Sequence, residues 1–409
     1  MKIHKAYKFR LYPNKEQAIL INKTIGCSRF VYNHFLNQWN ETYKETGKGL
    51  SYGKCSAQLP GLKKQEETIW LKEVDSIALQ SSLRNLSDSF DRFFKKQNQY
   101  PCFKSKKNPV QSYTTKSTNG NIAVLENKLK LPKIGFVRFA KSREVEGRIL
   151  NATIRKKTTG KYYISVLVES EVKPLEKTGS SVGVDVGLKY FAILSDKTVY
   201  VNPKFFRTLE KKLAREQRKL SRRKEEALKV GRKLSESKNY QKQRIKVAKI
   251  HESIKNKRTD YLHKISTEIV KNHDIIGIED LLVKNMVLNR KLAKAISEVS
   301  WAEFRNMLEY KAKWYGKELV VVARNFPSSQ LCSECGYQNK AVKNLTIREW
   351  KCPECHAHQD RDINASINLK QEALRILASK TVGTTGLAYQ NPTSRLEFLG
   401  ISIFKIQRI

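Results

Sequence analysis

Apolar and polar residues alternate at the start of the chain. Between residues 3 and 12, apolar positions are separated by Lys and Arg, which is the period of a strand with one buried and one basic face. From residue 15 to residue 94 apolar residues recur at helical spacing instead, and short alternating segments return at 122–172. A strand, then helices, then more strands predicts a small β-barrel interrupted by a helical module.

A different pattern begins near Ser181. Residues 181–196 are expected to form a strand, a turn and a second strand, and a long, highly charged helical stretch follows at 204–271. The elements expected after it are a short buried strand at 273–281, an amphipathic helix at 296–319 and a strand at 318–323. This mixture of strands and helices predicts a second domain, so the chain is of the α/β and α+β multidomain class.

The chain carries far more positive than negative charge. Its 409 residues include 79 Lys and Arg against 39 Asp and Glu, a formal net charge of +40. Nucleic-acid phosphates are the common partner for such an excess. An anionic membrane is the rival partner, but we find no long apolar span, and the first residues do not resemble a secretory signal. We expect a cytoplasmic, nucleoid-associated protein.

Much of this charge lies in the helical stretch at residues 204–271. It contains 23 Lys and Arg but 8 Asp and Glu, a net charge of +15. A solvated helix face or a coiled coil is the alternative interpretation. Because the two signs are not balanced, the pattern favours a helical hairpin that follows a phosphate backbone.

Four cysteines near the C-terminus form two CxxC pairs. The pairs are Cys332 with Cys335 and Cys352 with Cys355. Each pair can hold one tetrahedral ion with both thiolates, and two pairs joined by a short hairpin complete a structural zinc site. Disulfides are the alternative, but the other three cysteines are scattered and the total of seven is odd. We therefore predict one structural Zn²⁺.

Three acids, Asp185, Glu279 and Asp362, lie at the ends of expected strands or helices. A carboxylate among Val, Ile and Gly is costly unless it is paired or holds a cation. Three carboxylates gathered in this way can bind two Mg²⁺ ions, one activating water and the other stabilising the leaving 3′ oxygen of a phosphodiester.

Each acid also has an ordinary interpretation. Asp185 could be a turn residue or the phosphate-handling Asp of a sugar-kinase or actin-like ATPase. Glu279 could be a helix N-terminal acid, a role that Asp280 fits equally well. Asp362 could be a helix N-cap, or could be mistaken for Asp360. The order of the three acids, with the zinc hairpin just before the last, favours the metal-binding interpretation.

These motifs together resemble the TnpB family of transposon-encoded, RNA-guided nucleases, which are related to compact type V CRISPR effectors. The resemblance rests on segments such as YKFRLYPNKEQ (7–17), VGVDVGLKYFA (182–192), IEDLLVKNM (278–286), FPSSQLCSECG (326–336) and DRDINASINL (360–369). It implies that Asp185, Glu279 and Asp362 are the catalytic acids. Asp362 is favoured over Asp360 because the acid of the family's D-x-N-A signature lies two positions before Asn364.

The resemblance also implies a domain organisation. It comprises a wedge-like β-barrel (1–14 and 115–180) with a helical recognition insert (15–114), a RuvC-like nuclease domain of ribonuclease H fold (181–325 and 360–380), a zinc-binding hairpin (326–359) and a flexible tail (381–409). The first half would bind a guide RNA from the transposon end and a short motif that flanks the target. No preferred oligomer is indicated beyond one monomer per RNA.

The implied activity is Mg²⁺-dependent, RNA-guided cleavage of double-stranded DNA. A nuclease-silent, RNA-guided repressor is the alternative, although the three acids are intact. A strand-joining transposase is another, and a role as a CRISPR effector is a further one. The sequence departs from the family at His356, where Gly is usual, at Gln359 and at Ser366. His356 and His358 could contact metal, but four thiolates already fill a zinc site.

Nucleic-acid contacts are predicted in three places. A polar helix face could contact bases, although it could equally be solvated surface. A Lys- and Tyr-rich loop could stack on and contact RNA, although its aromatic residues could be core. The charged helices are expected to contact phosphates without adding sequence specificity. The residues are Gln80, Arg84, Tyr100, Phe103, Lys104, Lys106, Lys107, Arg222, Arg223 and Lys224.

Overall fold

The computed structural model describes residues 2–382, with side chains through residue 379. The chain divides into two compact units, Met1–Glu171 and Val172–Ile409. The tail predicted at residues 381–409 lies outside the described residues apart from its first two. Within residues 2–382, no helix combines the length and apolarity needed to cross a membrane.

The first unit begins with a strand and a helical module and then continues with strands, as the periodicity predicts. Its elements are β1 (Lys2–Tyr12), α1 (Lys15–Thr46), α2 (Tyr52–Leu62), a 3₁₀ helix (Glu66–Glu73), α3 (Ser76–Phe94), β2 (Gln111–Lys116), β3 (Ala123–Leu125), β4 (Lys128–Leu131), β5 (Gly135–Phe139), β6 (Arg148–Lys156) and β7 (Tyr162–Glu171). Helix α1 starts at a capping box, in which Asn14 and Gln17 exchange side-chain to backbone hydrogen bonds.

The seven strands form one antiparallel sheet in the order β2-β6-β7-β1-β5-β4-β3. The order does not return to its starting strand, so the described strands do not form the closed barrel that the sequence pattern predicts. Helix α3 packs against β2 at one edge, and β3 at the other edge has only three residues. The end strands β2 and β3 are not hydrogen-bonded to each other, and β3 offers only three residues for pairing, so the sheet stays open.

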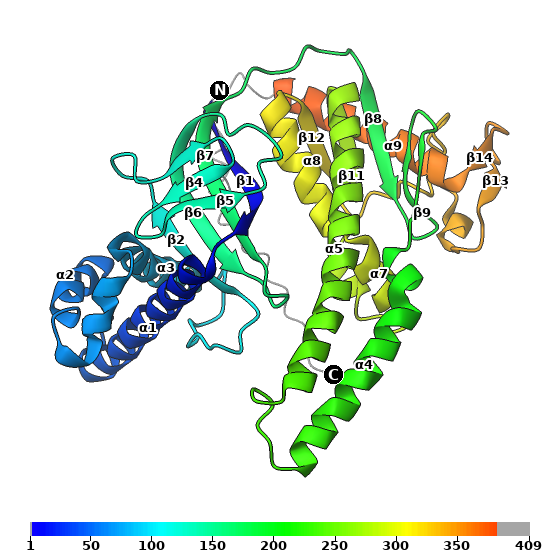
Figure 1. The fold of residues 1–409 in the computed structure, drawn as a ribbon. Helices are drawn as coiled ribbons and strands as arrows, with labels where there is room; N and C mark the ends of the chain where they lie inside the picture. Colours follow the sequence, from blue (N-terminus) through cyan, green and yellow to red (C-terminus); the bar gives the residue numbers. More distant parts are fainter. Residues whose placement is uncertain (1, 383–409) are drawn as a thin grey trace. The chain divides into compact units, whose positions relative to one another are not determined.

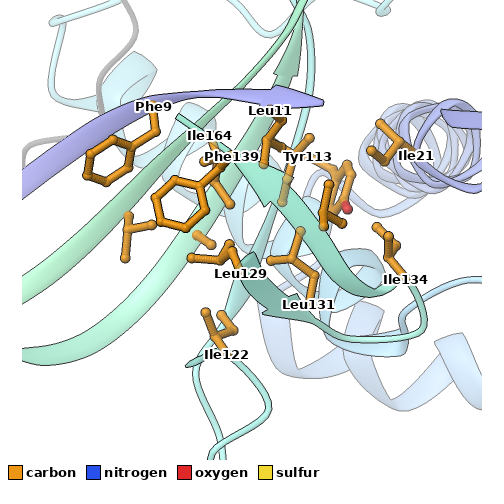
Figure 2. Packing of buried hydrophobic residues seen from close by; sticks show 14 of the residues in the cluster. Phe9, Leu11, Ile21, Tyr113, Ile122, Leu129, Leu131, Ile134, Phe139 and Ile164 are labelled. Atoms are coloured by element: carbon orange, nitrogen blue, oxygen red, sulfur yellow. The ribbon is translucent and has the colours of Figure 1, made fainter. Parts of the chain in front are cut away.

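Apolar side chains from one face of this sheet form its core (Figure 2). Phe9 of β1 and Phe139 of β5 pack edge to face, with ring centroids 5.1 Å apart. The helical module has a second core, in which the Trp39 and Phe90 rings stack at 3.9 Å. The alternation at residues 3–12 therefore predicts β1 and its buried face correctly.

The second unit contains a five-stranded sheet in the order β10-β9-β8-β11-β12 (Figure 1). Its elements are β8 (Ser181–Val186), β9 (Tyr190–Leu194), β10 (Val199–Val201), α4 (Phe205–Lys229), α5 (Lys238–Asn272), β11 (Ile275–Glu279), α6 (Val283–Met286), α7 (Ala293–Val299), α8 (Trp301–Tyr315), β12 (Glu318–Val322), a 3₁₀ helix (Lys340–Lys343), β13 (Glu349–Lys351), β14 (His358–Asp360) and α9 (Arg361–Val382). Strands β8, β11 and β12 are parallel, whereas β8, β9 and β10 are antiparallel. Helices α5 and α8 contribute to the core on one face of the sheet, and α9 packs against β8 and β11.

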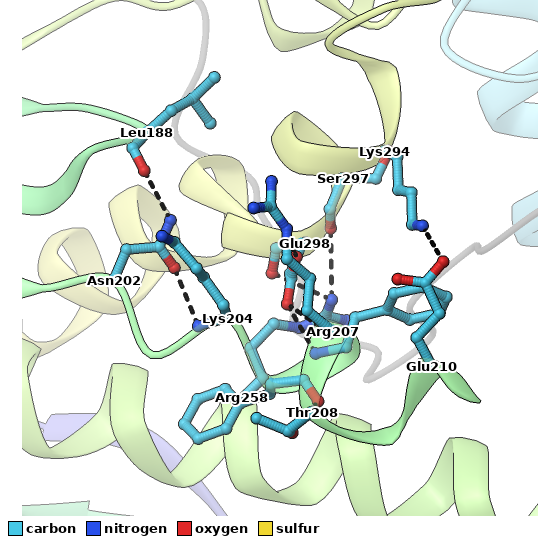
Figure 3. Close-up of polar contacts among 12 residues, drawn as sticks. Leu188, Asn202, Lys204, Arg207, Thr208, Glu210, Arg258, Lys294, Ser297 and Glu298 are labelled. Carbon is cyan, nitrogen blue, oxygen red and sulfur yellow. Dashed lines mark hydrogen bonds and ion pairs between the residues drawn. The ribbon is translucent and has the colours of Figure 1, made fainter. Parts of the chain in front are cut away.

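The prediction of a single helix at 296–319 is wrong, because two helices, α7 and α8, occupy this part of the chain. Ser300 has a left-handed backbone with φ 57° and separates α7 from α8. Glu298, two residues before Ser300, is buried. The Glu298 carboxylate accepts a 2.6 Å hydrogen bond from the backbone N–H of Phe206 at the start of α4 (Figure 3). Arg258 of α5 donates to the backbone carbonyls of Ser297 and Glu298. The break in the helix thus lets α7 anchor the base of the α4–α5 hairpin.

Candidate active site

Strands β8 and β11 place two of the predicted acids on one face of the sheet. In β8 the valines point into the core, so Gly183 and Asp185 point to the opposite face by the two-residue period of a strand. In β11 the same argument applies to Gly277 and Glu279. The register pairs Gly277 with Gly183, and each acid lies two residues beyond its glycine. Asp185 and Glu279 therefore lie at the same level of neighbouring parallel strands.

Helix α9 lies against this face and carries the third acid. A Cβ atom added at Gly183 would lie 1.8 Å from the backbone oxygen of Ser366, and one added at Gly277 would lie 2.5 Å from that of Leu369. The two glycines are therefore required by the close approach of a helix backbone rather than by an unusual φ angle. This approach brings Asp362, in the first turn of α9, towards the strand ends.

The geometry of the helix start separates Asp360 from Asp362. Asp360 precedes α9, and its carboxylate accepts hydrogen bonds from the backbone N–H groups of Asp362 (3.0 Å) and Ile363 (2.9 Å). Asp360 is therefore the N-cap. The residues alone left open which of the two aspartates is the site acid, and the family resemblance favoured Asp362. The cap at Asp360 leaves Asp362 as the candidate site acid.

The three candidate acids interact electrostatically. Burial raises the pKa of Asp185 to about 8, and repulsion from Asp362 and Glu279 contributes to this rise, against the opposing effect of Arg361 and Arg348. Burial and repulsion both disfavour a second or third negative charge at one place. Ionisation of Asp185 is therefore disfavoured first by burial and then by the two neighbouring acids.

Glu279 and its neighbour Asp280 have different environments. Burial, followed by repulsion from Asp280, raises the pKa of Glu279. Asp280 instead accepts hydrogen bonds from Arg324, at 2.9 Å, and from Arg305, which lower its pKa. Asp280 is neutralised within the chain, so Glu279 is the better metal-ligand candidate of the two.

Arg348 is a candidate functional residue that the sequence interpretation missed. It lies just before β13, and its Nη1 atom is 3.2 Å and 3.3 Å from the two carboxylate oxygens of Asp362. Only its place in the REWKC segment, four residues before a predicted zinc ligand, could have drawn attention to it. Folding brings this cation to the acids from a hairpin that is remote from both strands.

The four cysteines come together as the CxxC spacing predicts. Their sulfur atoms all lie within 4.8 Å of one another, with Cys332–Cys355 and Cys335–Cys352 sulfur distances of 3.6 Å. These distances exclude disulfides, in which the sulfurs are about 2 Å apart. A tetrahedral ion with Zn–S bonds of about 2.3 Å would hold its sulfurs roughly 3.8 Å apart. The four thiols therefore fit one metal ion such as zinc.

The three carboxylates are less tightly gathered than the thiols. Among the His, Cys, Asp and Glu side chains of residues 2–379, only the four cysteines bring three or more potential ligand atoms within 4.8 Å of one another. The ion pair between Asp362 and Arg348 is consistent with this looser arrangement.

Asparagines of α9 join the candidate acid to the cysteine hairpin. Asn364 is fully buried, donates to the backbone oxygen of Leu331 at 2.6 Å and accepts from the backbone N–H of Ser333 at 2.8 Å. Asn368 donates to the oxygens of Ser328 and Leu331 at 2.8 Å. The Asn of the D-x-N-A segment is thus the physical link between the hairpin and the helix that carries Asp362.

The two histidines of the hairpin lie outside the metal cluster found among the described residues. His356 has a φ of 58°, and Gly336, which follows the first CxxC pair, has a φ of 78°. Both residues occupy the same turn position, where glycine is favoured. Nε2 of His358 is 3.9 Å from a Glu349 carboxylate oxygen.

The polar residues predicted on α3 are exposed. Gln80 faces solvent, and Arg84 lies 5.3 Å from the ring centre of Tyr52 and 3.4 Å from the Asp88 carboxylate. Their predicted contact with DNA bases stays a prediction.

The predicted RNA-contacting loop includes partly packed side chains. Tyr100 packs its ring against Phe90 and Phe93, and its hydroxyl lies 2.6 Å from Asn40 Oδ1. Lys104 is exposed as a residue, but its Nζ lies 3.6 Å from the Tyr32 ring centre, and desolvation of the ammonium lowers the pKa of Lys104 to about 8. The exposed side chains of this loop include Phe103, Lys106 and Lys107.

The three basic residues predicted on α4 differ from one another. Arg222 and Lys224 are solvent-facing, whereas Arg223 donates to the backbone oxygen of Asn239 at 2.9 Å and lies 3.4 Å from Gln243 Oε1, so it joins α4 to α5. Its guanidinium is used within the hairpin, which makes Arg222 and Lys224 the better candidates for phosphate contact.

Comparisons with known proteins identify the family. Over 96% of the chain, 37% of residues are identical to a putative RNA-guided DNA endonuclease of Streptomyces pristinaespiralis, and the match covers 94% of that protein. Identity is 34% to the putative RNA-guided DNA endonuclease InsQ of Escherichia coli K12, over 97% of the chain and 99% of InsQ. The chain belongs to the TnpB family.

Domain-level matches agree with TnpB membership. Residues 164–290 match a family described as a probable transposase, 301–369 match a Cas12f1-like TNB domain, and 1–48 match a family described as a helix-turn-helix domain. In the structure, however, residues 2–46 of this TnpB protein form one strand and one long helix. A Cas12f1 protein from a complex with guide RNA and target DNA has a similar fold, with a TM-score of 0.57 at 14% identity, over 90% of this chain and 99% of that one.

Proposed function

We propose that this TnpB protein is a transposon-encoded, RNA-guided DNA endonuclease that hydrolyses phosphodiester bonds beside a short flanking motif. The proposal is supported by Asp185 and Glu279 near the carboxyl ends of the neighbouring parallel strands β8 and β11, and by Asp362 in the first turn of α9, the helix packed against them. The relatives named as RNA-guided DNA endonucleases match over nearly their full lengths, which supports the same activity here.

The three acids fit a magnesium site by their chemistry. Carboxylate oxygens are the ligands that Mg²⁺ prefers. The raised pKa values of Asp185 and Glu279 mean that their ionised forms are disfavoured, and a bound cation would favour ionisation. Two bound Mg²⁺ ions would supply an activated water and stabilise the leaving 3′ oxygen. Asp185 and Glu279 would hold the ions from rigid strands, and Asp362 would complete the site from α9.

Arg348 has a role of its own in this proposal. With metal bound, Asp362 would no longer depend on the Arg348 guanidinium for its counter-charge. Arg348 would then be available to contact the non-bridging oxygens of the scissile phosphate, for which its planar donors are suited. The cysteine hairpin, holding one Zn²⁺, would position Arg348 relative to α9.

The finer fold assignment is part of the proposal. The strand order of the second unit, with three antiparallel strands followed by two parallel ones, supports a RuvC-like nuclease domain of ribonuclease H fold. The first unit would serve as the wedge and recognition domains, although its sheet is open. The net charge of +40 supports binding to a guide RNA and to the target DNA, whose sequence would be read by base pairing.

The test uses protein co-expressed with RNA from downstream of its own gene. The purified complex, with Mg²⁺, is incubated with a plasmid that carries the guide-matched target beside a randomised flank. We expect guide-dependent cutting by the wild type and none by Asp185→Ala. Guided binding without cutting would favour the repressor, and guide-independent strand joining would favour a transposase.

A further inference from the structure

The helical module of the first unit contains a groove of about 640 Å³. Most of the residues that line it lie on one face of α1, between Lys23 and Asn37. Trp70 and Glu73 of the 3₁₀ helix and Lys106 of the loop after α3 complete the lining. The volume lies within the range of ligand-binding pockets, roughly 300 to 1,000 Å³. The groove therefore has room for a small molecule or for one unit of a polymer.

Three aromatic rings form a continuous surface in this groove. Phe30 and Trp70 pack edge to face with ring centres 5.0 Å apart, and Phe30 and His34 stack at 5.9 Å. Trp70 is 37% exposed. Its indole N–H donates to the backbone oxygen of Glu67 at 2.9 Å, so its exposed part offers ring surface but no further donor. An exposed tryptophan beside two half-buried rings suits a ligand with a planar group that stacks.

His34 adds hydrogen-bonding capacity beside these rings. No hydrogen bond joins its ring nitrogens to another residue within the described chain, and neither nitrogen is among the buried atoms that lack a partner. Both nitrogens are therefore accessible from the groove. Burial lowers the pKa of His34, so the ring is neutral at pH 7, with one nitrogen donating and the other accepting. The edge of a nucleobase offers partners of both kinds.

The charged residues of the groove leave an excess of positive charge. Lys23 and Glu73 form an ion pair with each other. Arg29 donates to the neutral side-chain oxygen of Gln111 at 3.0 Å, and Lys106 is exposed without an ion pair among the described residues. Two cations thus remain without an acid. An anionic ligand fits this groove, whereas a second copy of a chain with a net charge of +40 does not.

A stacking surface, an accessible imidazole and two cations match the base and the phosphate of a nucleotide. We propose that this groove binds one unpaired nucleotide of the guide RNA. Its base stacks against Trp70 and hydrogen-bonds to His34. Its phosphate contacts Arg29 and Lys106.

The choice of RNA follows from which bases are unpaired in a guided complex. The target strand is paired with the guide and the flanking DNA is a duplex, whereas bases in the loops and bulges of a folded RNA are unstacked and accessible. This inference rests on the proposed function, and it assigns a contact site for the guide within the helical module.

The experiment measures guide-RNA affinity of the full-length protein by filter binding, without DNA. The RNAs carry a single abasic nucleotide at successive unpaired positions. We expect Trp70→Leu to weaken RNA binding about five- to tenfold, within the range for loss of one stacked base. Trp70→Phe, which keeps a ring, should bind nearly as tightly as the wild type. One abasic position should weaken wild-type binding similarly and have little further effect in Trp70→Leu.

Two lysines of the same module provide a matched comparison for the phosphate contact. Lys106→Ser should flatten the fall of log affinity with log salt by about 0.7, the value for one phosphate of a single strand. Lys72 is also exposed and lies on the 3₁₀ helix, outside the groove lining. Lys72→Ser should keep the wild-type slope. Equal slopes for the two variants would overturn the assigned phosphate contact.

The outcomes separate the groove from the proposed function. Wild-type affinity of Trp70→Leu, or abasic effects of the same size in both proteins, would overturn the groove. An effect of Trp70→Leu that appears only after target DNA is added would place a DNA nucleotide there, and would overturn the assignment to RNA. A wild type that binds the guide RNA without cutting would refute the nuclease but not the groove. A wild type that binds no RNA would refute both.

Discussion

At the scale of single residues, two glycines determine whether the third acid can reach the other two. Gly183 and Gly277 carry no side chain where α9 crosses the sheet, and the helix backbone occupies the space that a Cβ atom would need. The sequence shows small residues beside Asp185, but their reason becomes clear only when a helix almost 200 residues further along the chain is placed against them.

Gly183→Ala should therefore both destabilise the second unit and slow cleavage. The added Cβ would lie 1.8 Å from the Ser366 oxygen, so α9 must shift and carry Asp362 with it. We expect a loss of about 3 kcal/mol in unfolding free energy and roughly 100-fold in cleavage rate. Urea unfolding and single-turnover cleavage measure the two effects. Gly53→Ala, whose Cβ would meet nothing closer than 3.9 Å, is the control and should neither destabilise the protein nor slow cleavage.

Lys311 is a buried cation whose charge depends on pH. Its ammonium donates to the His263 carbonyl and to the Ser266 and Thr267 hydroxyls at 2.7–2.8 Å, with no carboxylate among these partners. Burial lowers the pKa of Lys311 to about 8. The folded state therefore binds fewer protons than the unfolded state between pH 8 and the ordinary value of 10.5, so this group's contribution to stability rises with pH across that window.

Lys311→Met should remove this pH dependence. The unfolding free energy of the wild type minus that of Lys311→Met is expected to increase from pH 8 to pH 10.5 and to be constant below pH 8. Chemical denaturation across this pH range measures it, and Lys313→Met on the same helix is the control. A difference that does not vary with pH would show that Lys311 titrates at its ordinary value.

At the scale of elements, periodicity predicted most helices and strands, but contacts between distant segments decided the rest. The break at Ser300 was missed because neither Ser nor its neighbours interrupt the helical pattern, and it is anchored by Glu298 and Arg258, which act across other elements. The ion pair between Arg348 and Asp362 was missed for the same reason. The cysteine spacing, in contrast, specifies its own geometry locally, so the cluster was predicted correctly.

Removal of metal from the cysteine hairpin should impair the acidic site. Asn364 and Asn368 tie α9 to the backbone between Ser328 and Ser333, next to Cys332. We expect Cys335→Ser, or treatment with a zinc chelator, to slow cleavage about 100-fold through misplacement of Asp362 and Arg348. Added Zn²⁺ should restore the chelated protein. Cys102→Ser, at an exposed cysteine outside the cluster, should cut normally. Unchanged cleavage by metal-free protein would show that the hairpin does not position the acids.

At the scale of the whole molecule, charge is the property that composition alone revealed, but composition could not say which side chains are available to a partner. The α4–α5 hairpin illustrates the difference. Its net charge predicted a phosphate-binding surface, yet Arg223 is used to hold the two helices together. Glu216 likewise accepts a 2.7 Å hydrogen bond from Gln243 across the hairpin. Neither contact has a signature in the sequence.

The solvent-facing pair Arg222 and Lys224 should therefore contribute to RNA or DNA affinity without contributing to sequence preference. Each phosphate contact steepens the fall of log affinity with log salt by about 0.7 to 0.9. If both residues contact phosphates, the double variant Arg222→Ser with Lys224→Ser should flatten that slope by about 1.4 to 1.8 while the melting temperature stays unchanged. Filter binding of the guide RNA and of target DNA, over a series of KCl concentrations, measures the slope.

Arg223→Ser is the matched comparison, because it should lower the melting temperature through loss of its bonds to Asn239 and Gln243. A slope identical to the wild type for the double variant would mean that this face of α4 meets no phosphate, and that the nucleic acid lies on another basic surface of the chain.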